Sequence, residues 1–254
     1  MRKSARAITV VLLGLALAGC QSNSTVTKPP TDRAKLSQIN AELGAQYMRN
    51  REYQIAMDKL TKAVELDPRN INAHGTKALL HAVIGQYEQA EASFKQALRI
   101  DAENSAVLNN YGQFLCQRGR FDEGQQLILK AVANPLYANA ESGFYNAGAC
   151  AMGNGKLDEA DGYFRKALEI DSQMAPALLQ MADLSLQLSR ALQARAYLQR
   201  YSNVAQMSAR ALWLGVQIER ELGNHEDEAS YSVQLQKNYP DSTQTKLLLE
   251  SKPQ

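Results

Sequence analysis

A set of small and apolar residues recurs every 34 residues, and this interval limits the possible folds more than any other feature of the chain. The first copy covers residues 37–70. It holds two apolar stripes with the three- and four-residue spacing of an amphipathic α-helix, one through Leu43, Gly44 and Tyr47 and one through Ala56, Leu60 and Ala63. The spacing predicts a pair of helices joined by a turn in each copy.

The small residues in these stripes have a steric reason to be small. Gly44, Ala56 and Ala63 lie where two helices approach closely, so a larger side chain would separate the backbones. The pattern resembles the tetratricopeptide repeat, a helix–turn–helix unit of 34 residues. The resemblance implies an all-α, right-handed superhelix (solenoid) in which each unit packs only on its neighbours.

Five more copies follow, which makes about six repeats in residues 36–241. Two positions depart from the pattern: Gly124 stands where the third repeat should have alanine, and Ser189 replaces the turn glycine of the fifth. A solenoid must cover its last apolar face, so we expect a closing helix in 242–254, capped by Asp241 or Ser242. The expected repeats are about 37–70, 71–104, 105–140, 141–174, 175–207 and 208–241.

The first 19 residues are predicted to be a signal peptide that is not part of the fold. A basic start precedes an apolar run, Ile8 to Ala18, that is too short to cross a bilayer as a helix. The run ends in Leu-Ala-Gly-Cys at residues 17–20, which resembles the bacterial lipoprotein signal and makes Cys20 the lipidation site. The alternative is an ordinary signal peptide with a chance cysteine.

Residues 20–35 are predicted to form the lipidated cysteine and a flexible tether, because the stretch is polar and contains Pro29 and Pro30. The residue directly after the cysteine is Gln21 and not an aspartate. By resemblance to enterobacterial lipoproteins, this favours an outer-membrane, lipid-anchored, periplasm-facing protein that is delivered by the lipoprotein sorting machinery.

The mature chain is nearly neutral. Three of the 28 basic side chains precede Cys20, which leaves 25 against 26 acidic ones. Nucleic-acid binding needs a clustered basic face, and none is visible, so no nucleic-acid partner is expected.

Two cysteines remain after Cys20. Cys116 and Cys150 lie in the predicted first helices of adjacent repeats, at the twelfth and tenth places. An exported protein can keep a disulfide, but whether these sulfurs face each other depends on about one residue of register. A disulfide and two separately buried thiols are both compatible with the sequence.

The sequence offers no arrangement for catalysis, so we expect no enzyme, cofactor, metal site or small-molecule substrate. His74 and His81 share a helix face but lie about 10 Å apart along it, too far for one metal ion, and both occupy packing positions. No strand precedes a glycine-rich phosphate loop. Neither Cys116 nor Cys150 has a histidine at a recognisable nucleophile spacing.

The resemblance to the repeat family implies a concave groove lined by the first helix of each repeat, suited to an apolar or extended peptide or to a helix. Any single member could instead pack against the next repeat. Trp213 is a further candidate anchor for a partner, with packing on the fifth repeat as its alternative. The candidate groove residues are Met48, Leu79, Val83, Asn109, Gln113, Gln117, Tyr145, Met152, Leu179, Asp183 and Leu186.

Several stretches go beyond the generic repeat: NNYGQFLCQRGRFDE (109–123), PLYANAESGFYNAGACA (135–151), LLQMADLS (178–185), ARAYLQRY (194–201) and SARALWLGVQIERELG (208–223). They are similar to the pilotin lipoproteins of type IV pilus systems, the PilF/PilW type. The resemblance implies an outer-membrane protein that binds a secretin subunit and promotes its localisation and multimerisation for pilus assembly. The alternative is a general scaffold for outer-membrane assembly or for cell-wall enzymes.

Overall fold

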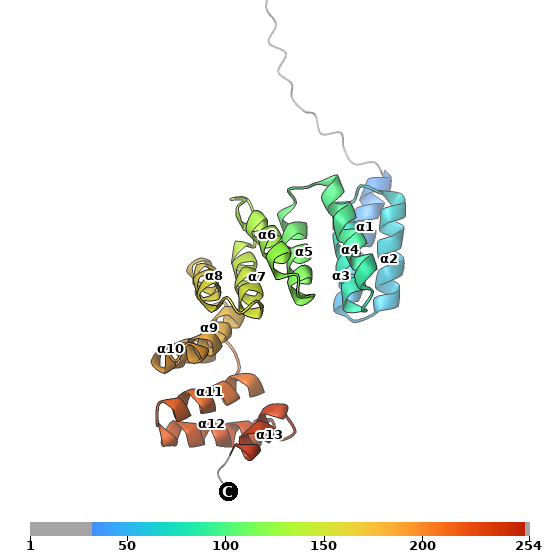
Figure 1. Ribbon diagram of the computed structural model, residues 1–254. Helices are drawn as coiled ribbons and strands as arrows, with labels where there is room; N and C mark the ends of the chain where they lie inside the picture. Colours follow the sequence, from blue (N-terminus) through green and yellow to red (C-terminus); the bar gives the residue numbers. More distant parts are fainter. Residues whose placement is uncertain (1–31, 252–254) are drawn as a thin grey trace, which may run out of the picture.

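The computed structural model describes residues 32–251, and the regular structure in this range is entirely helical, which confirms the all-α prediction (Figure 1). No helix in the described range is both long and apolar enough to cross a membrane. The helices are α1 Asp32–Arg49, α2 Tyr53–Leu66, α3 Ile71–Val83, α4 Tyr87–Ile100, α5 Ser105–Gln117, α6 Phe121–Val132, α7 Ala140–Gly153, α8 Leu157–Ile170, α9 Ala175–Gln187, α10 Ala191–Val204, α11 Ala209–Glu221, α12 His225–Asn238 and α13 Thr243–Glu250.

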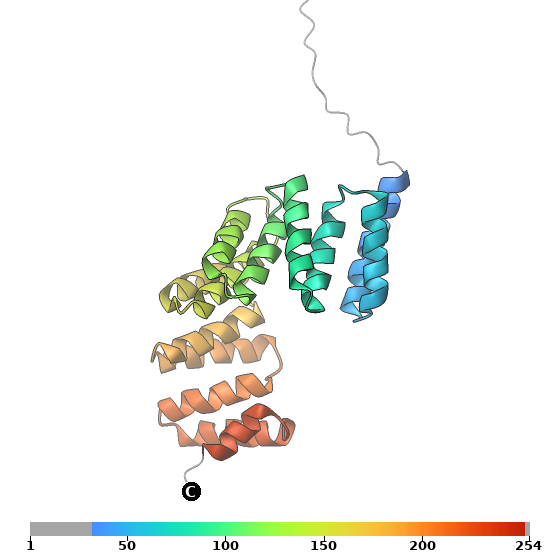
Figure 2. The same cartoon turned by 45° about the vertical axis from the view of Figure 1, so that its right-hand side comes forward.

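Consecutive helices pack as pairs, from α1/α2 to α11/α12, and α13 follows the last pair. The first helix of each pair also packs against the second helix of the pair before it. The pairs therefore stack into a curved solenoid rather than around one central core, as Figures 1 and 2 show from two sides.

Helix α1 begins earlier than the predicted tether allows. Residues 32–35 were assigned to the tether, but they form the first turn of α1. The turn is held in place because Ser37 is buried and its Oγ donates to the carbonyl of Ala63 at 2.7 Å, while Arg33 Nη2 donates to the carbonyl of Glu65 at 3.2 Å. The predicted signal peptide, Cys20 and the rest of the predicted tether lie outside the described residues.

The two helices of each pair are joined by a three-residue turn whose middle residue has a positive φ. Gly85, Gly119, Gly155 and Gly223 occupy this place with φ between +68° and +79°. In the first and fifth repeats the place is taken by Arg51 (φ +64°) and Ser189 (φ +56°). The left-handed conformation brings a Cβ atom close to the following carbonyl oxygen and costs about 1–2 kcal/mol.

We therefore expect Ser189→Gly to raise the free energy of unfolding by about 0.5–1 kcal/mol. Removing the Cβ relieves the local strain, and the larger entropy of glycine in the unfolded chain offsets part of the gain. Urea titration followed by far-UV circular dichroism measures the change. The reverse substitution Gly155→Ser is the matched control and should destabilise; a loss of stability in Ser189→Gly would contradict the strain argument.

The last repeat is covered by α13. Ser242 caps this helix, since its Oγ accepts a hydrogen bond from the backbone N–H of Thr245 at 3.1 Å. Leu248 of α13 is buried in one cluster with Leu212, Val216 and Leu235. The closing helix thus packs against α11 and α12 and fills the place that the first helix of a further repeat would take. Residues 252–254 lie outside the described range.

Candidate binding groove

The first helices of the second, third and fourth repeats, α3, α5 and α7, form a trough on the inner face of the solenoid. A hollow of about 320 Å³ lies between α3 and α5, and a second hollow of about 240 Å³ lies between α5 and α7. Both are lined by Gln113 and Gln117 of α5, so they are two parts of one trough. We refer to these two hollows together as the inner trough.

Five of the candidate groove residues line the inner trough. Leu79 and Val83 come from α3, Gln113 and Gln117 from α5, and Tyr145 from α7. These residues therefore lie on the faces that the resemblance predicted, and their role in binding a partner stays a prediction.

Four other candidates are partly buried by packing within the solenoid. Met48 packs against the cluster of Ala56, Leu60 and Leu80. The remaining three pack against the core of the fourth to sixth repeats; they are Met152, Leu179 and Leu186.

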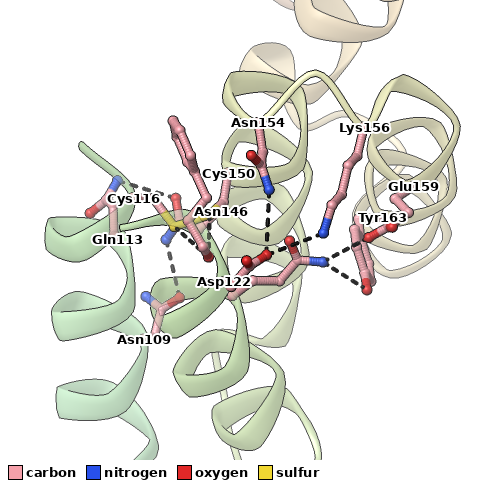
Figure 3. Close-up of a disulfide and its surroundings, with 12 residues drawn as sticks. Asn109, Gln113, Cys116, Asp122, Asn146, Cys150, Asn154, Lys156, Glu159 and Tyr163 are labelled. Carbon is pink, nitrogen blue, oxygen red and sulfur yellow. Dashed lines mark hydrogen bonds and ion pairs between the residues drawn. A yellow bond between two sulfur atoms is a disulfide. The ribbon is translucent and has the colours of Figure 1, made fainter. Parts of the chain in front are cut away.

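The prediction that Asn109 lines the groove is wrong. Only 5% of Asn109 is exposed. Asn146 Nδ2 donates a hydrogen bond to Asn109 Oδ1 at 3.1 Å, and Gln113 Nε2 in turn donates to Asn146 Oδ1 at 3.2 Å (Figure 3). These three amides form a ladder between α5 and α7 that fixes the two helices side by side, so Asn109 supports the inner trough from below.

Asp183 and Trp213 also have structural partners. Arg210 Nη2 donates to Asp183 Oδ2 at 2.7 Å, which ties α9 to α11. Trp213 is partly buried against the cluster of Leu212, Val216, Leu235 and Leu248 under α13. This cluster joins α11 and α12 to the closing helix α13, and the role of Trp213 as a partner anchor stays a prediction.

Cys116 of α5 and Cys150 of α7 are joined by a disulfide, with their Cα atoms 5.4 Å apart (Figure 3). The register that the sequence left open therefore places the two sulfurs face to face. Both cysteines line the part of the inner trough between α5 and α7. The bond links the third repeat covalently to the fourth within the trough wall.

Further polar contacts join the second helices of these same two repeats (Figure 3). Gln125 Nε2 of α6 donates to Glu159 Oε2 at 3.0 Å and to Tyr163 Oη at 3.3 Å, both on α8. Lys156 Nζ forms an ion pair with Asp122 at 3.2 Å. The junction of the third and fourth repeats is therefore held on its inner side by the disulfide and the amide ladder and on its outer side by these contacts.

An arginine without an acidic partner lies at one end of the inner trough. The Arg118 guanidinium lies over the ring of Tyr87, with Cζ 4.0 Å from the ring centroid, and both residues line the hollow between α3 and α5. No carboxylate of the described residues lies within 4.0 Å of its nitrogens. Its positive charge is thus held at the trough without a direct ion pair.

The nearby Arg120 is bound quite differently. Its guanidinium pairs with Glu91 at 2.9 Å and with Glu123 at 2.7 Å. Hydrogen bonds from Lys95, Arg120 and Tyr111 lower the pKa of the Glu91 carboxyl to about 2. Glu91 is thus a fixed anion already shared among three donors, and Arg120 is a structural residue of the α4–α5–α6 junction.

The family groove positions missed several residues that line the trough. Asn110 lies one place from the predicted Asn109, so a shift of one residue along α5 would have found it. Tyr87 is the first residue of α4, and Arg118 directly follows the last residue of α5. Both line the trough but lie outside the groove positions of the repeat family.

Two of the three histidines, His74 and His81, are used in packing. His74 and His81 are each 9% exposed. His74 Nε2 lies 3.0 Å from the Pro68 carbonyl oxygen, and His81 Nδ1 lies 2.7 Å from Gln86 Oε1. Within residues 32–251, no group of three or more His, Cys, Asp or Glu side chains is placed to hold a metal ion.

The stack of helix pairs and the inner trough define the chain as a tetratricopeptide-repeat protein, a class whose concave faces serve as binding surfaces. Models of the tetratricopeptide repeat match residues 42–105 and 84–140, and the model of the cilia and flagella-associated protein 70 middle TPR-like domain matches residues 136–237. The type IV pilus assembly protein PilF of Pseudomonas aeruginosa is 31% identical over 239 residues, covering 93% of this chain and 95% of PilF. The chain therefore belongs to the PilF family of type IV pilus assembly proteins.

Solved structures agree with this assignment. The structure of Pseudomonas aeruginosa PilF has a TM-score of 0.79 and 29% identity, and covers 87% of this chain and 100% of its own. PilW, described as a widely conserved type IV pilus biogenesis factor, has a TM-score of 0.80 and 31% identity, with 85% and 99% coverage. The similarity extends over nearly the whole of each relative.

Proposed function

We propose that this protein is a pilotin, an outer-membrane lipoprotein that binds a type IV pilus secretin subunit and promotes its localisation and multimerisation. The observation that supports this most is the similarity to PilF over nearly the full length of both chains. The inner trough supplies a surface for a protein partner, and residues 1–20 supply the features of a lipoprotein signal.

The proposed mechanism is transport by tethering. Acyl chains on Cys20 contribute about 0.8 kcal/mol per buried methylene, so two or three chains hold the protein stably on a membrane. The lipoprotein sorting machinery then carries the anchored protein, with an unassembled secretin chain in its groove, to the outer membrane. Secretin subunits delivered in this way meet at a high effective concentration on the membrane surface, which favours ring assembly.

Removing the anchor tests the proposal. We expect Cys20→Ala to leave the repeats folded and able to bind the secretin, while the secretin fails to reach the outer membrane and forms few rings. A second variant, in which the signal peptide of a soluble exported protein is joined to Gln21, releases the repeats into the periplasm. Membrane fractionation and immunoblotting for secretin monomer and multimer measure the outcome.

Two results would contradict the proposal. Unchanged secretin localisation and ring formation in both variants would remove the carrier role of the anchor. Copurification with a barrel-assembly subunit or a cell-wall hydrolase, in place of a secretin, would favour the general scaffold.

A further inference from the structure

The hollow between α3 and α5 has two chemically different walls. The α3 wall is apolar and consists of Leu79, Ala82 and Val83, of which Val83 is 57% exposed. These aliphatic side chains lie beside a hollow of about 320 Å³. The free energy of binding becomes more favourable when a partner's apolar side chain removes them from water. This wall therefore selects an aliphatic or aromatic side chain of the occupant.

The α5 wall carries three side-chain amides, from Asn110, Gln113 and Gln117. The amides of Asn110 and Gln117 have no hydrogen-bond partner among the described residues, and Gln113 uses its nitrogen on Asn146 and keeps its oxygen available. Each free amide offers a donor and an acceptor, as does each peptide unit of an extended chain. A helix has already used its backbone groups internally, so this wall favours an extended segment.

The end of the hollow carries the positive charge of Arg118. Tyr87 holds the guanidinium in place through the face of its ring. Arg118 and Tyr87 also line a neighbouring hollow together with Glu88 and Glu91, but neither carboxylate lies within 4.0 Å of the Arg118 nitrogens, and Glu91 is engaged by Lys95 and Arg120. A guanidinium with free N–H groups binds a carboxylate strongly.

We propose that this hollow binds an extended segment of a protein partner in which an apolar side chain lies close to an Asp or Glu. The apolar side chain packs against Leu79, Ala82 and Val83, the amides of α5 bind the backbone, and Arg118 pairs with the carboxylate. The inference rests on the proposed function only in that the partner is a protein; it specifies the chemistry of the bound segment.

A display library of random linear peptides, selected on the purified full chain, tests this without assuming the partner's identity. We expect the selected peptides to combine an aliphatic or aromatic residue with a nearby Asp or Glu. For one selected peptide, Arg118→Gln should weaken binding about tenfold, while Arg118→Lys keeps part of the affinity. Arg99→Gln, at an exposed arginine on α4 with no side-chain partner among the described residues, is the matched control and should leave affinity unchanged.

A double-mutant cycle identifies the pair. Replacing the peptide's acidic residue by its amide should weaken binding to the wild type about tenfold and have little effect on Arg118→Gln. Equal loss in both proteins, selected peptides without acidic residues, or no selected peptide at all would each overturn the proposal. If no peptide binds but the folded secretin is still captured, the pilotin function stands and this inference fails; if peptides bind but no secretin is captured, the reverse holds.

Discussion

Replacing both Cys116 and Cys150 by alanine is expected to lower the free energy of unfolding by about 3–4 kcal/mol. The disulfide closes a loop of 34 residues, and in the chain-entropy description a loop of this length restricts the unfolded chain by about that amount. The native geometry should change little, because the amide ladder of Asn109, Asn146 and Gln113 still joins α5 to α7. Urea titrations of the variant and the wild type measure the difference.

The position of the bond predicts a second consequence. Each repeat contacts only its neighbours, so cooperative unfolding depends on every junction. Without the bond, the junction of the third and fourth repeats is weakened in the middle of the array, and the unfolding transition should broaden. Wild type with reductant should behave like the variant, and the variant should not respond to reductant. A variant as stable as the oxidised wild type would contradict this account.

Gly124→Ala is expected to lower the free energy of unfolding by about 3 kcal/mol, although it adds only one methyl group. A Cβ at residue 124 would lie 2.5 Å from the carbonyl oxygen of Gly112 and 2.5 Å from Cys116 Sγ. The oxygen belongs to the backbone of α5 and the sulfur to the disulfide, so neither can move aside easily. Overpacking of a close helix crossing therefore separates α5 from α6.

Gly162→Ala is the matched control for this substitution. Gly162 lies inside α8, and a Cβ there meets no atom within 4 Å. Alanine has the higher helix propensity, so this variant should be more stable by about 0.5–1 kcal/mol. Thermal and urea unfolding of the two variants give the comparison. Similar shifts in both would show that backbone propensity, and not the crossing of α5 and α6, decides the effect at residue 124.

The repeat interval made the helix pairs predictable, because the period of apolar and small residues follows directly from helix geometry. The physical reasons for the departures from this pattern could not be predicted. At residue 124 the pattern calls for alanine, and only the structure shows that Gly112 and the disulfide leave no room for a Cβ. Likewise, the early start of α1 depends on Ser37 reaching the carbonyl of Ala63, a contact between two helices that no local pattern contains.

The candidate groove could be predicted only in part, because the pattern gives the face of a helix and not the use of each residue on it. A repeat pattern defines which face of α3, α5 and α7 is concave, and this was sufficient to place five residues on the trough, namely Leu79, Val83, Gln113, Gln117 and Tyr145. It does not say which residues on that face are used for packing between repeats, so Asn109 was misplaced. Arg118 was missed because its position depends on a ring from the preceding repeat, Tyr87, that holds its guanidinium.

A stack of repeats has no intrinsic length, since each unit presents at one end the same kind of surface that it covers at the other. Helix α13 ends the array. Leu248 packs on the apolar surface of Leu212 and Val216 that another repeat would otherwise cover. A molecule sealed in this way cannot add a second copy end to end at that terminus. The closing helix thereby prevents open-ended polymerisation through this end of the stack.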